Sequence, residues 1–105
     1  SNVEKVMFGG WCLDRTQYQL FDEKGTPADL TTGEFKLLEA LVLSANRVLS
    51  REHLFDLTRE QEYDSYDRAI DIQIARLRKK LGKDSGMIKT VRGVGYMFNG
   101  ETQAA

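Results

Sequence analysis

Most of the positive charge of this 105-residue sequence is gathered in one segment near its C-terminal end. Residues 68–96 contain eight Lys and Arg against two Asp, a net charge of +6, whereas residues 1–67 have a net charge of −6 and the whole chain −1. Guanidinium and ammonium groups bind phosphates by charge-assisted hydrogen bonds, and arginine can also donate two parallel bonds to the edge of a base. A positive face on an otherwise acidic chain therefore favours a polyanion binder over a merely solvated helix, whose ion pairs would need more acids within reach.

A predicted helix over about residues 67–81 carries the densest part of this charge. At 100° per residue, the apolar residues of the segment fall within about 40° of Ile70 and predict a stripe that packs on the core. These residues are Ile70, Ile74, Leu77 and Leu81. The outward half contains Arg68, Asp71, Ala75, Arg76, Arg78 and Lys79. Gly82 is expected just past the helix end, where its freedom to adopt a positive φ suits the cap.

Two more helices are predicted before the basic one. The spacing of Thr31 and Glu34 predicts a capping box that starts a helix over about residues 32–45. Ser50 is expected to cap a second, shorter helix, with Leu54 and Leu57 facing the core. A polar loop of about eight residues follows.

Short strands are predicted at both ends of the chain. Residues near 5–8, 11–14, 17–21 and 27–30 are expected to form a four-stranded antiparallel meander. Residues 87–100 are expected to be two short β runs joined around Arg92, Gly93, Val94 and Gly95, which is a hairpin. The tail "GETQAA" is expected to be disordered.

This order of elements describes an α+β fold, the winged helix. The major groove of B-DNA is about 12 Å wide and admits one α-helix, and an arginine at a hairpin tip can reach the adjacent minor groove. Two alternatives stay open. One is a protein-interaction module whose basic helix docks an acidic partner. The other is an RNA binder, although A-form RNA suits a long recognition helix poorly and the basic helix offers no aromatic platform.

Two residues of the basic helix have more than one interpretation. Ile72 lies at 200° on the wheel, amid charged residues, where it could pack on a thymine methyl group; the alternative is burial under the second helix or the hairpin. Asp71 would repel phosphate, so it is expected to accept from a cytosine amino group or to orient Arg68 or Arg78. It could equally be a first-turn acid that the helix dipole stabilises.

The stretches "LTTGEFKLLEAL", "LSREHL", "DRAIDIQIARLRKKLG" and "IKTVRGVGYMF" resemble the C-terminal effector domain of OmpR/PhoB-type response regulators, over about residues 5–99. The resemblance implies a winged helix-turn-helix with an N-terminal four-stranded antiparallel sheet, three helices and a C-terminal β-hairpin wing. It implies sequence-specific double-stranded DNA binding for transcriptional regulation in a two-component system, as a homodimer on direct-repeat half-sites. A full-length member has an N-terminal receiver domain and a cognate histidine kinase. No receiver is seen here, so residues 1–105 are expected to be one isolated effector domain with an ordered core over about 5–99.

The resemblance also implies roles for individual residues. Positions that face bases are matched by Asp71, Ile72, Ala75 and Arg76. Positions that hold phosphates are matched by Arg68, Arg78, Lys79, Thr90 and Tyr96. Arg92 matches the wing arginine of the minor groove, and the loop that touches RNA polymerase is matched by residues 58–66, with Glu60, Glu62 and Asp64 as candidates. Ala75 is small where some members have a long polar residue, so its base contact is at most a methyl contact.

Other functions find little support in the sequence. One histidine, His53, and one cysteine, Cys12, give no zinc spacing, and no nucleophile–base pair stands out, so neither an enzyme nor a metal or other cofactor is expected. The Gly-x-Gly of "GVGYMF" lies between strands and lacks the third glycine of a dinucleotide site. The apolar runs are far below the ~18 residues of a membrane span. A buried, unpaired Cys12 fits a reducing compartment, and we expect a cytoplasmic protein without a membrane partner.

Overall fold

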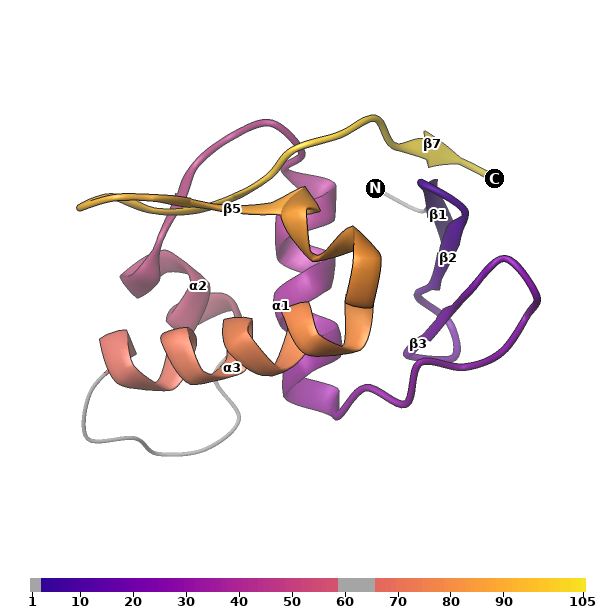
Figure 1. Cartoon of the computed structure of the whole chain (residues 1–105), viewed down its shortest axis with the longest axis horizontal. Helices are drawn as coiled ribbons and strands as arrows, with labels where there is room; N and C mark the ends of the chain where they lie inside the picture. Colours follow the sequence, from indigo (N-terminus) through magenta and orange to yellow (C-terminus); the bar gives the residue numbers. More distant parts are fainter. Residues whose placement is uncertain (1–2, 59–65) are drawn as a thin grey trace.

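The computed structural model describes residues 3–58 and 66–105, with side chains from residue 69 onward in the second range. The helices are α1 (Thr32–Leu43), α2 (Arg51–Thr58) and α3 (Tyr66–Leu81), which continues into the 3-10 helix η1 (Gly82–Met87). The strands are β1 (Lys5–Phe8), β2 (Trp11–Asp14), β3 (Gln19–Phe21), β4 (Leu49–Ser50), β5 (Ile88–Val91), β6 (Gly95–Phe98) and β7 (Gln103–Ala104). In Figure 1, α1 lies between the N-terminal strands on the right and the remaining helices with the β5–β6 hairpin on the left.

The N-terminal sheet has four antiparallel strands, as predicted, but its fourth strand comes from an unexpected place. The strand order is β3-β2-β1-β7, and β7 pairs with β1 through Val6 opposite Ala104 and Met7 opposite Gln103. The predicted strand over residues 27–30 is therefore wrong: only Pro27 makes an isolated bridge, and Asp29 has a φ of 64°, which breaks extended backbone. The prediction of a disordered tail is also wrong, because the free edge of β1 offers backbone hydrogen-bonding groups that the tail pairs with.

Helix α1 begins as the sequence predicts. The Thr31 hydroxyl accepts a hydrogen bond from the Glu34 N–H (3.1 Å), and the Glu34 carboxylate accepts one from the Thr31 N–H (3.0 Å), which completes the capping box. The helix ends at Leu43, two residues earlier than predicted. Asn46 has a φ of 66°, and its N–H donates to the carbonyl of Phe98 (2.7 Å), so the chain turns here toward β4.

Helix α2 has the predicted cap, but its buried face is narrower than predicted. The Ser50 hydroxyl accepts from the His53 N–H (3.0 Å), which confirms the cap. Leu54 is fully buried, whereas Leu57 is 50% exposed, so the prediction that Leu57 faces the core is wrong. The buried pair is Leu54 and Thr58, four residues apart, and Leu57 lies about 60° to one side of Leu54 on the helix. The Thr58 hydroxyl is satisfied by donating to the Leu54 carbonyl (2.8 Å).

Helix α3 packs on the core through the predicted stripe. Ile70, Ile74, Leu77 and Leu81 are all at most 1% exposed, and they join a core to which α1, the N-terminal sheet and β6 also contribute. Gly82 has a φ of +57° directly after the helix, as its predicted position requires. Burial of this stripe leaves the other side of the helix turned to solvent.

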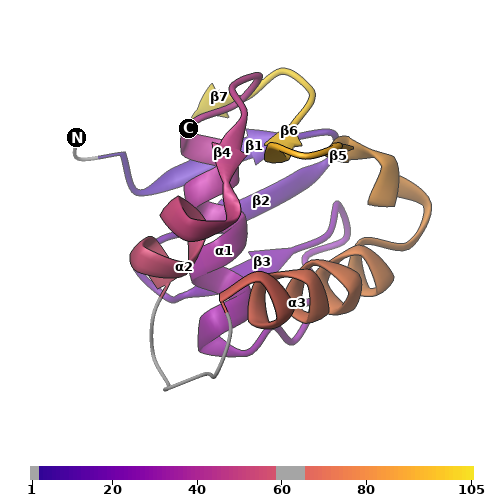
Figure 2. The same cartoon turned by 90° about the vertical axis from the view of Figure 1, so that its left-hand side faces the viewer.

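Strands β5 and β6 with their turn, residues 88–98, form the predicted hairpin, which we call the wing. Ile88 pairs with Phe98 and Val91 with Gly95, and the turn closes with a hydrogen bond from the Val94 N–H to the Val91 carbonyl (2.9 Å). The wing belongs to a second sheet of order β4-β6-β5, which attaches it to the strand directly before α2. Figures 1 and 2 show the end of the wing and the N-terminal half of α3 on the same side of the molecule.

Candidate nucleic-acid interface

The four predicted base-facing residues share one exposed side of α3. Asp71 and Ala75, and likewise Ile72 and Arg76, are four residues apart, so they lie one helical turn from each other. All four are exposed. Ile72 is 43% exposed, which excludes the alternative in which it is buried under α2 or the wing. Its side chain is a free apolar group beside the positively charged side chains of α3.

Arg78 connects α3 to the wing. Its Nε (3.1 Å) and one terminal nitrogen (2.7 Å) donate to the carbonyl of Ile88, and the same terminal nitrogen donates to the hydroxyl of Thr90 (2.8 Å). Two predicted phosphate-binding residues, Arg78 and Thr90, are thus neighbours across the junction of α3 and β5. The second terminal nitrogen of Arg78 has no hydrogen bond among the described residues, which leaves donors for a ligand.

Asp71 has partners that the sequence did not reveal. Its Oδ1 accepts hydrogen bonds from the Nε of Arg51 (2.8 Å), the first residue of α2, and from the hydroxyl of Tyr96 on β6. The prediction that it orients Arg78 is wrong, because the hydrogen bonds of Arg78 run to β5; the Arg68 side chain lies outside the described residues. Asp71 is the sixth residue of α3 and so lies beyond the first turn, where the helix dipole acts most strongly.

The local electrostatics keep Asp71 charged and Tyr96 neutral. Burial alone would raise the pKa of Asp71, but the hydrogen bonds from Tyr96 and Arg51 outweigh it and lower the pKa below its usual value. Burial, and then the hydrogen bond to Asp71, raise the pKa of Tyr96. The guanidinium carbons of Arg51 and Arg78 lie 5.1 and 5.6 Å from the centre of the Tyr96 ring, within cation–π range.

The remaining predicted residues are spread over the same region. Arg92 is exposed at the wing turn, where Gly93 has a φ of +74°, and Lys79 is exposed on α3. Tyr96 is only 5% exposed, and its hydroxyl donates to Asp71, so its proton is not available to a phosphate in this conformation. The predicted polymerase-contacting residues Glu60, Glu62 and Asp64 lie outside the described residues.

Not every lysine of α3 faces the same way. The Nζ of Lys80 lies 2.6 Å from the Glu34 carboxylate and 2.8 Å from the Asp29 carbonyl, so this lysine attaches α3 to the start of α1. Burial would raise the pKa of Glu34, but the hydrogen bonds from Lys80 and Thr31 lower it overall. Lys80 therefore contributes to packing rather than to an exposed cationic surface.

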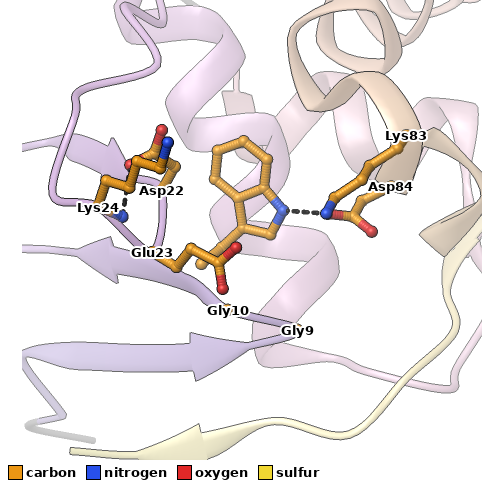
Figure 3. A pocket seen from close by; sticks show the side chains of 8 residues that line it. Gly9, Gly10, Asp22, Glu23, Lys24, Lys83 and Asp84 are labelled. Carbon is orange, nitrogen blue, oxygen red and sulfur yellow. Dashed lines mark hydrogen bonds between the residues drawn. The ribbon is translucent and has the colours of Figure 1, made fainter.

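A cavity of about 330 Å³ lies between the N-terminal sheet and η1 (Figure 3). It is lined by Gly9, Gly10, Trp11, Asp22, Glu23, Lys24, Lys83 and Asp84. The Trp11 indole N–H donates to the Asp84 carboxylate (2.8 Å), which joins β2 to η1. Within the described ranges, no group of His, Cys, Asp and Glu could hold a metal ion, and none of the helices could span a membrane.

Cys12, expected to be buried, is only half-buried beside its cross-strand partners Met7 and Phe21.

The sequence of this chain matches a family model and several curated relatives. The family model described as "Transcriptional regulatory protein, C terminal" matches residues 25–98. The regulatory protein VirG of Agrobacterium tumefaciens is 43% identical over 101 residues, which cover 93% of this chain and 38% of VirG. The chain thus spans about two fifths of the length of the curated relatives it matches.

Solved structures of two relatives share the fold over nearly the whole chain. The DNA-binding domain of RstA from Klebsiella pneumoniae, solved in complex with the RstA box, is 34% identical with a TM-score of 0.77, covering 91% of this chain and 97% of that one. The DNA-binding domain of CpxR from E. coli is 33% identical with a TM-score of 0.80, covering 96% and 98%. The matched family consists of domains of transcriptional regulators and not of enzymes. The chain therefore belongs to the family of C-terminal domains of transcriptional regulatory proteins, and it is an OmpR/PhoB-type effector domain with a winged helix-turn-helix fold.

Proposed function

We propose that this chain binds double-stranded DNA as the single output domain of a two-component response regulator, with α3 in a major groove and the wing tip in the adjacent minor groove. DNA binding for transcription regulation is the function of its family. The main structural support for this arrangement is that α3 has an exposed side with Ile72 and Arg76, and that Arg78 joins α3 directly to the wing. A helix and a hairpin held together in this way can enter neighbouring grooves of one duplex.

The base contacts in this proposal come from four side chains of α3. Arg76 donates to a guanine, the commonest specific contact of arginine in the major groove. Ile72 and the Ala75 methyl group pack on thymine methyl groups. Asp71 accepts from a cytosine amino group through Oδ2, which no hydrogen bond from another described residue reaches, while Oδ1 is held by Arg51 and Tyr96.

The phosphate contacts surround this reading surface. Arg78 and Thr90 lie at the junction of α3 and β5, and Lys79 follows Arg78 as an exposed residue of α3. Arg68, near the start of α3, is predicted to be a further contact. Arg92 enters the minor groove at the wing tip, where a narrow groove attracts arginine. The predicted phosphate contact of Tyr96 would require its hydroxyl to leave Asp71. The three cations among the phosphate contacts, Arg68, Arg78 and Lys79, would neutralise phosphates, and the logarithm of the affinity would fall with the logarithm of the salt concentration at a slope of about −2.7.

Further partners follow from the family and from relatives longer than this chain. In the full-length protein, an N-terminal receiver domain, controlled by a cognate histidine kinase, would promote a homodimer on direct-repeat half-sites. The segment with Glu60, Glu62 and Asp64 would contact RNA polymerase. Because the ligand that we propose is DNA, we also propose that the protein acts in the cytoplasm. The RstA domain, solved with the RstA box, is the precedent for a specific operator.

Selection from a pool of random duplexes tests the proposal. We expect an enriched motif that repeats at about one helical turn, and tighter binding to that duplex than to a shuffled duplex or to duplex RNA at the same salt concentration. Fluorescence anisotropy between 50 and 200 mM salt would give the affinity at each salt concentration. A plot of the logarithm of the affinity against the logarithm of the salt concentration should have the slope expected from the phosphate contacts. No enrichment together with salt-independent binding would refute DNA binding. A competition experiment in a gel shift tests the alternative of a protein-docking module. Nonspecific duplex that displaces a bound acidic protein would favour DNA binding, and an acidic protein that stays bound would favour the docking module.

A further inference from the structure

The hydrogen bonds to Asp71 join three elements that the DNA proposal requires in a fixed arrangement. Arg51 is the first residue of α2, Asp71 lies on α3, and Tyr96 lies on β6 of the wing. We propose that Arg51 and Tyr96 are positioning residues, which set the angle of the wing against α3 through the Asp71 carboxylate. This inference rests on the proposed DNA binding and assigns Arg51 a role that the sequence did not suggest.

Convergence on one atom supports this role. Arg51 and Tyr96 both donate to the same oxygen of Asp71, so neither α2 nor the wing can move relative to α3 without stretching a bond to that atom. Both bonds involve an ionised acceptor, which makes them stronger than bonds between neutral groups. Tyr96 is 5% exposed, so its ring has little freedom to follow a displaced partner.

The wing is also held along both of its strands. In β4 and β6, Leu49 pairs with Tyr96 and Ser50 with Gly95, so the backbone ladder fixes one edge of the wing next to the residue that precedes Arg51. Arg78 fixes β5 to α3 from the other direction, through Ile88 and Thr90. These attachments reach as far as Gly95, which pairs with Val91 directly before the turn, and only the turn with Arg92 extends beyond them.

A tilt of the wing about Tyr96 displaces the tip. Tyr96 pairs with Thr90 across the hairpin, so Arg92 lies two residues beyond that pair, and at about 3.3 Å per residue the lever is roughly 7 Å long. A tilt of about 10° would then move the tip by roughly 1 Å, which is more than the spread of about 0.5 Å in hydrogen-bond lengths. The bonds to Asp71 can therefore decide whether Arg92 meets its groove while α3 occupies its own.

Two substitutions remove these bonds with little loss of packing. Tyr96→Phe removes one hydroxyl and keeps the ring, and Arg51→Met keeps an unbranched stem without donors. On the selected duplex we expect each to weaken binding by about three- to tenfold. In an Arg92→Ala background the same substitutions should weaken binding by less than about twofold, because the tip they position no longer reads DNA.

The chain offers a matched control. Arg15 and Glu39 form an ion pair through an Nε–carboxylate contact of the same length, 2.8 Å, between the end of β2 and α1. Glu39→Gln weakens that pair without touching α3 or the wing, and it should leave DNA affinity within about twofold of the unmodified protein. A direct phosphate contact of the Tyr96 hydroxyl would instead give losses that add to that of Arg92→Ala, and this result would overturn the positioning role.

A measurement on the DNA-free protein separates this inference from the DNA proposal. Residual dipolar couplings of the amide groups in residues 69–81 and 88–98 report the orientation of the wing relative to α3. Tyr96→Phe and Arg51→Met should change this orientation or broaden its distribution, and Glu39→Gln should not. Unchanged couplings would overturn the inference even if DNA is bound. Changed couplings in a protein that binds no duplex would support the positioning and refute the proposed function alone.

Discussion

Gly95 lies where β6 crosses closest to β4, and replacing it with alanine should separate the wing from the strand before α2. A Cβ on Gly95 would lie 2.0 Å from the Leu49 carbonyl oxygen, 2.8 Å from the Leu49 carbonyl carbon and 2.9 Å from the Ser50 Cα. All three are backbone atoms, so no rotamer change relieves the clash, and β4 must move by more than about 1 Å. Overpacking of this kind costs roughly 1–3 kcal/mol, and the rigid surroundings place Gly95→Ala near about 3 kcal/mol.

Two other glycines provide controls for the same substitution. Apart from its chain neighbours and the backbone of its own helix, Gly86 has no heavy atom within 4 Å of its added Cβ, and its φ is not positive, so Gly86→Ala should be neutral or slightly stabilising. Gly93 also has open space but a φ of +74°, so Gly93→Ala isolates the cost of a left-handed conformation, about 1 kcal/mol.

Urea unfolding at 25 °C would give the free energy of unfolding for each variant, and thermal unfolding should place Gly95→Ala about 12–24 °C below the unmodified protein. A free energy of unfolding for Gly95→Ala within about 0.5 kcal/mol of that for Gly86→Ala would refute the close backbone approach of β6 and β4.

Three further substitutions test separate parts of the structure. Lys79→Ala should weaken binding to all duplexes alike and reduce the salt slope by about one, measured by anisotropy; an unchanged slope would remove Lys79 from the phosphate contacts. Thr31→Ala should lower the free energy of unfolding by about 1 kcal/mol in urea, and no loss would contradict the capping box. The pKa of Glu34 is lowered despite burial, by Lys80 and Thr31, so its stabilisation is complete above about pH 4.5 and is lost as the pH falls through the lowered pKa. Glu34→Gln should flatten the fall in urea stability between pH 6 and pH 3, and parallel curves would contradict this.

The parts of the fold that local patterns determine could be predicted from the sequence. The capping box needs only Thr31 and Glu34 three residues apart, and the stripe from Ile70 to Leu81 follows from helical periodicity. The hairpin needs a short turn with a glycine at a positive φ, which Gly93 supplies. The order of these elements, together with the family resemblance, then predicted the winged helix and the exposed side of α3.

The parts that depend on distant partners could not be predicted. Strand β7 has two residues and no pattern of its own, and it exists because β1 has a free edge. Leu57 has the composition of a core residue but lies beside the narrow face that α2 buries. The helical wheel gave the direction of Asp71, whereas its partners Arg51 and Tyr96 are 20 and 25 residues away on other elements. Only the tertiary structure brings these three together.

The central claim is that α3 and the wing read one duplex together, with Arg76 in the major groove and Arg92 in the minor groove. The most direct test is the binding free energy of Arg76→Ala and Arg92→Ala on the selected duplex and on its single-base variants. We expect Arg76→Ala to cost about 1–3 kcal/mol of binding free energy on the selected duplex and to relax the sequence preference at one base pair. We expect Arg92→Ala to weaken binding as well, and to change the sequence preference most at a base pair outside the site that α3 contacts. Equal losses on every sequence, or no loss for either variant, would contradict the account.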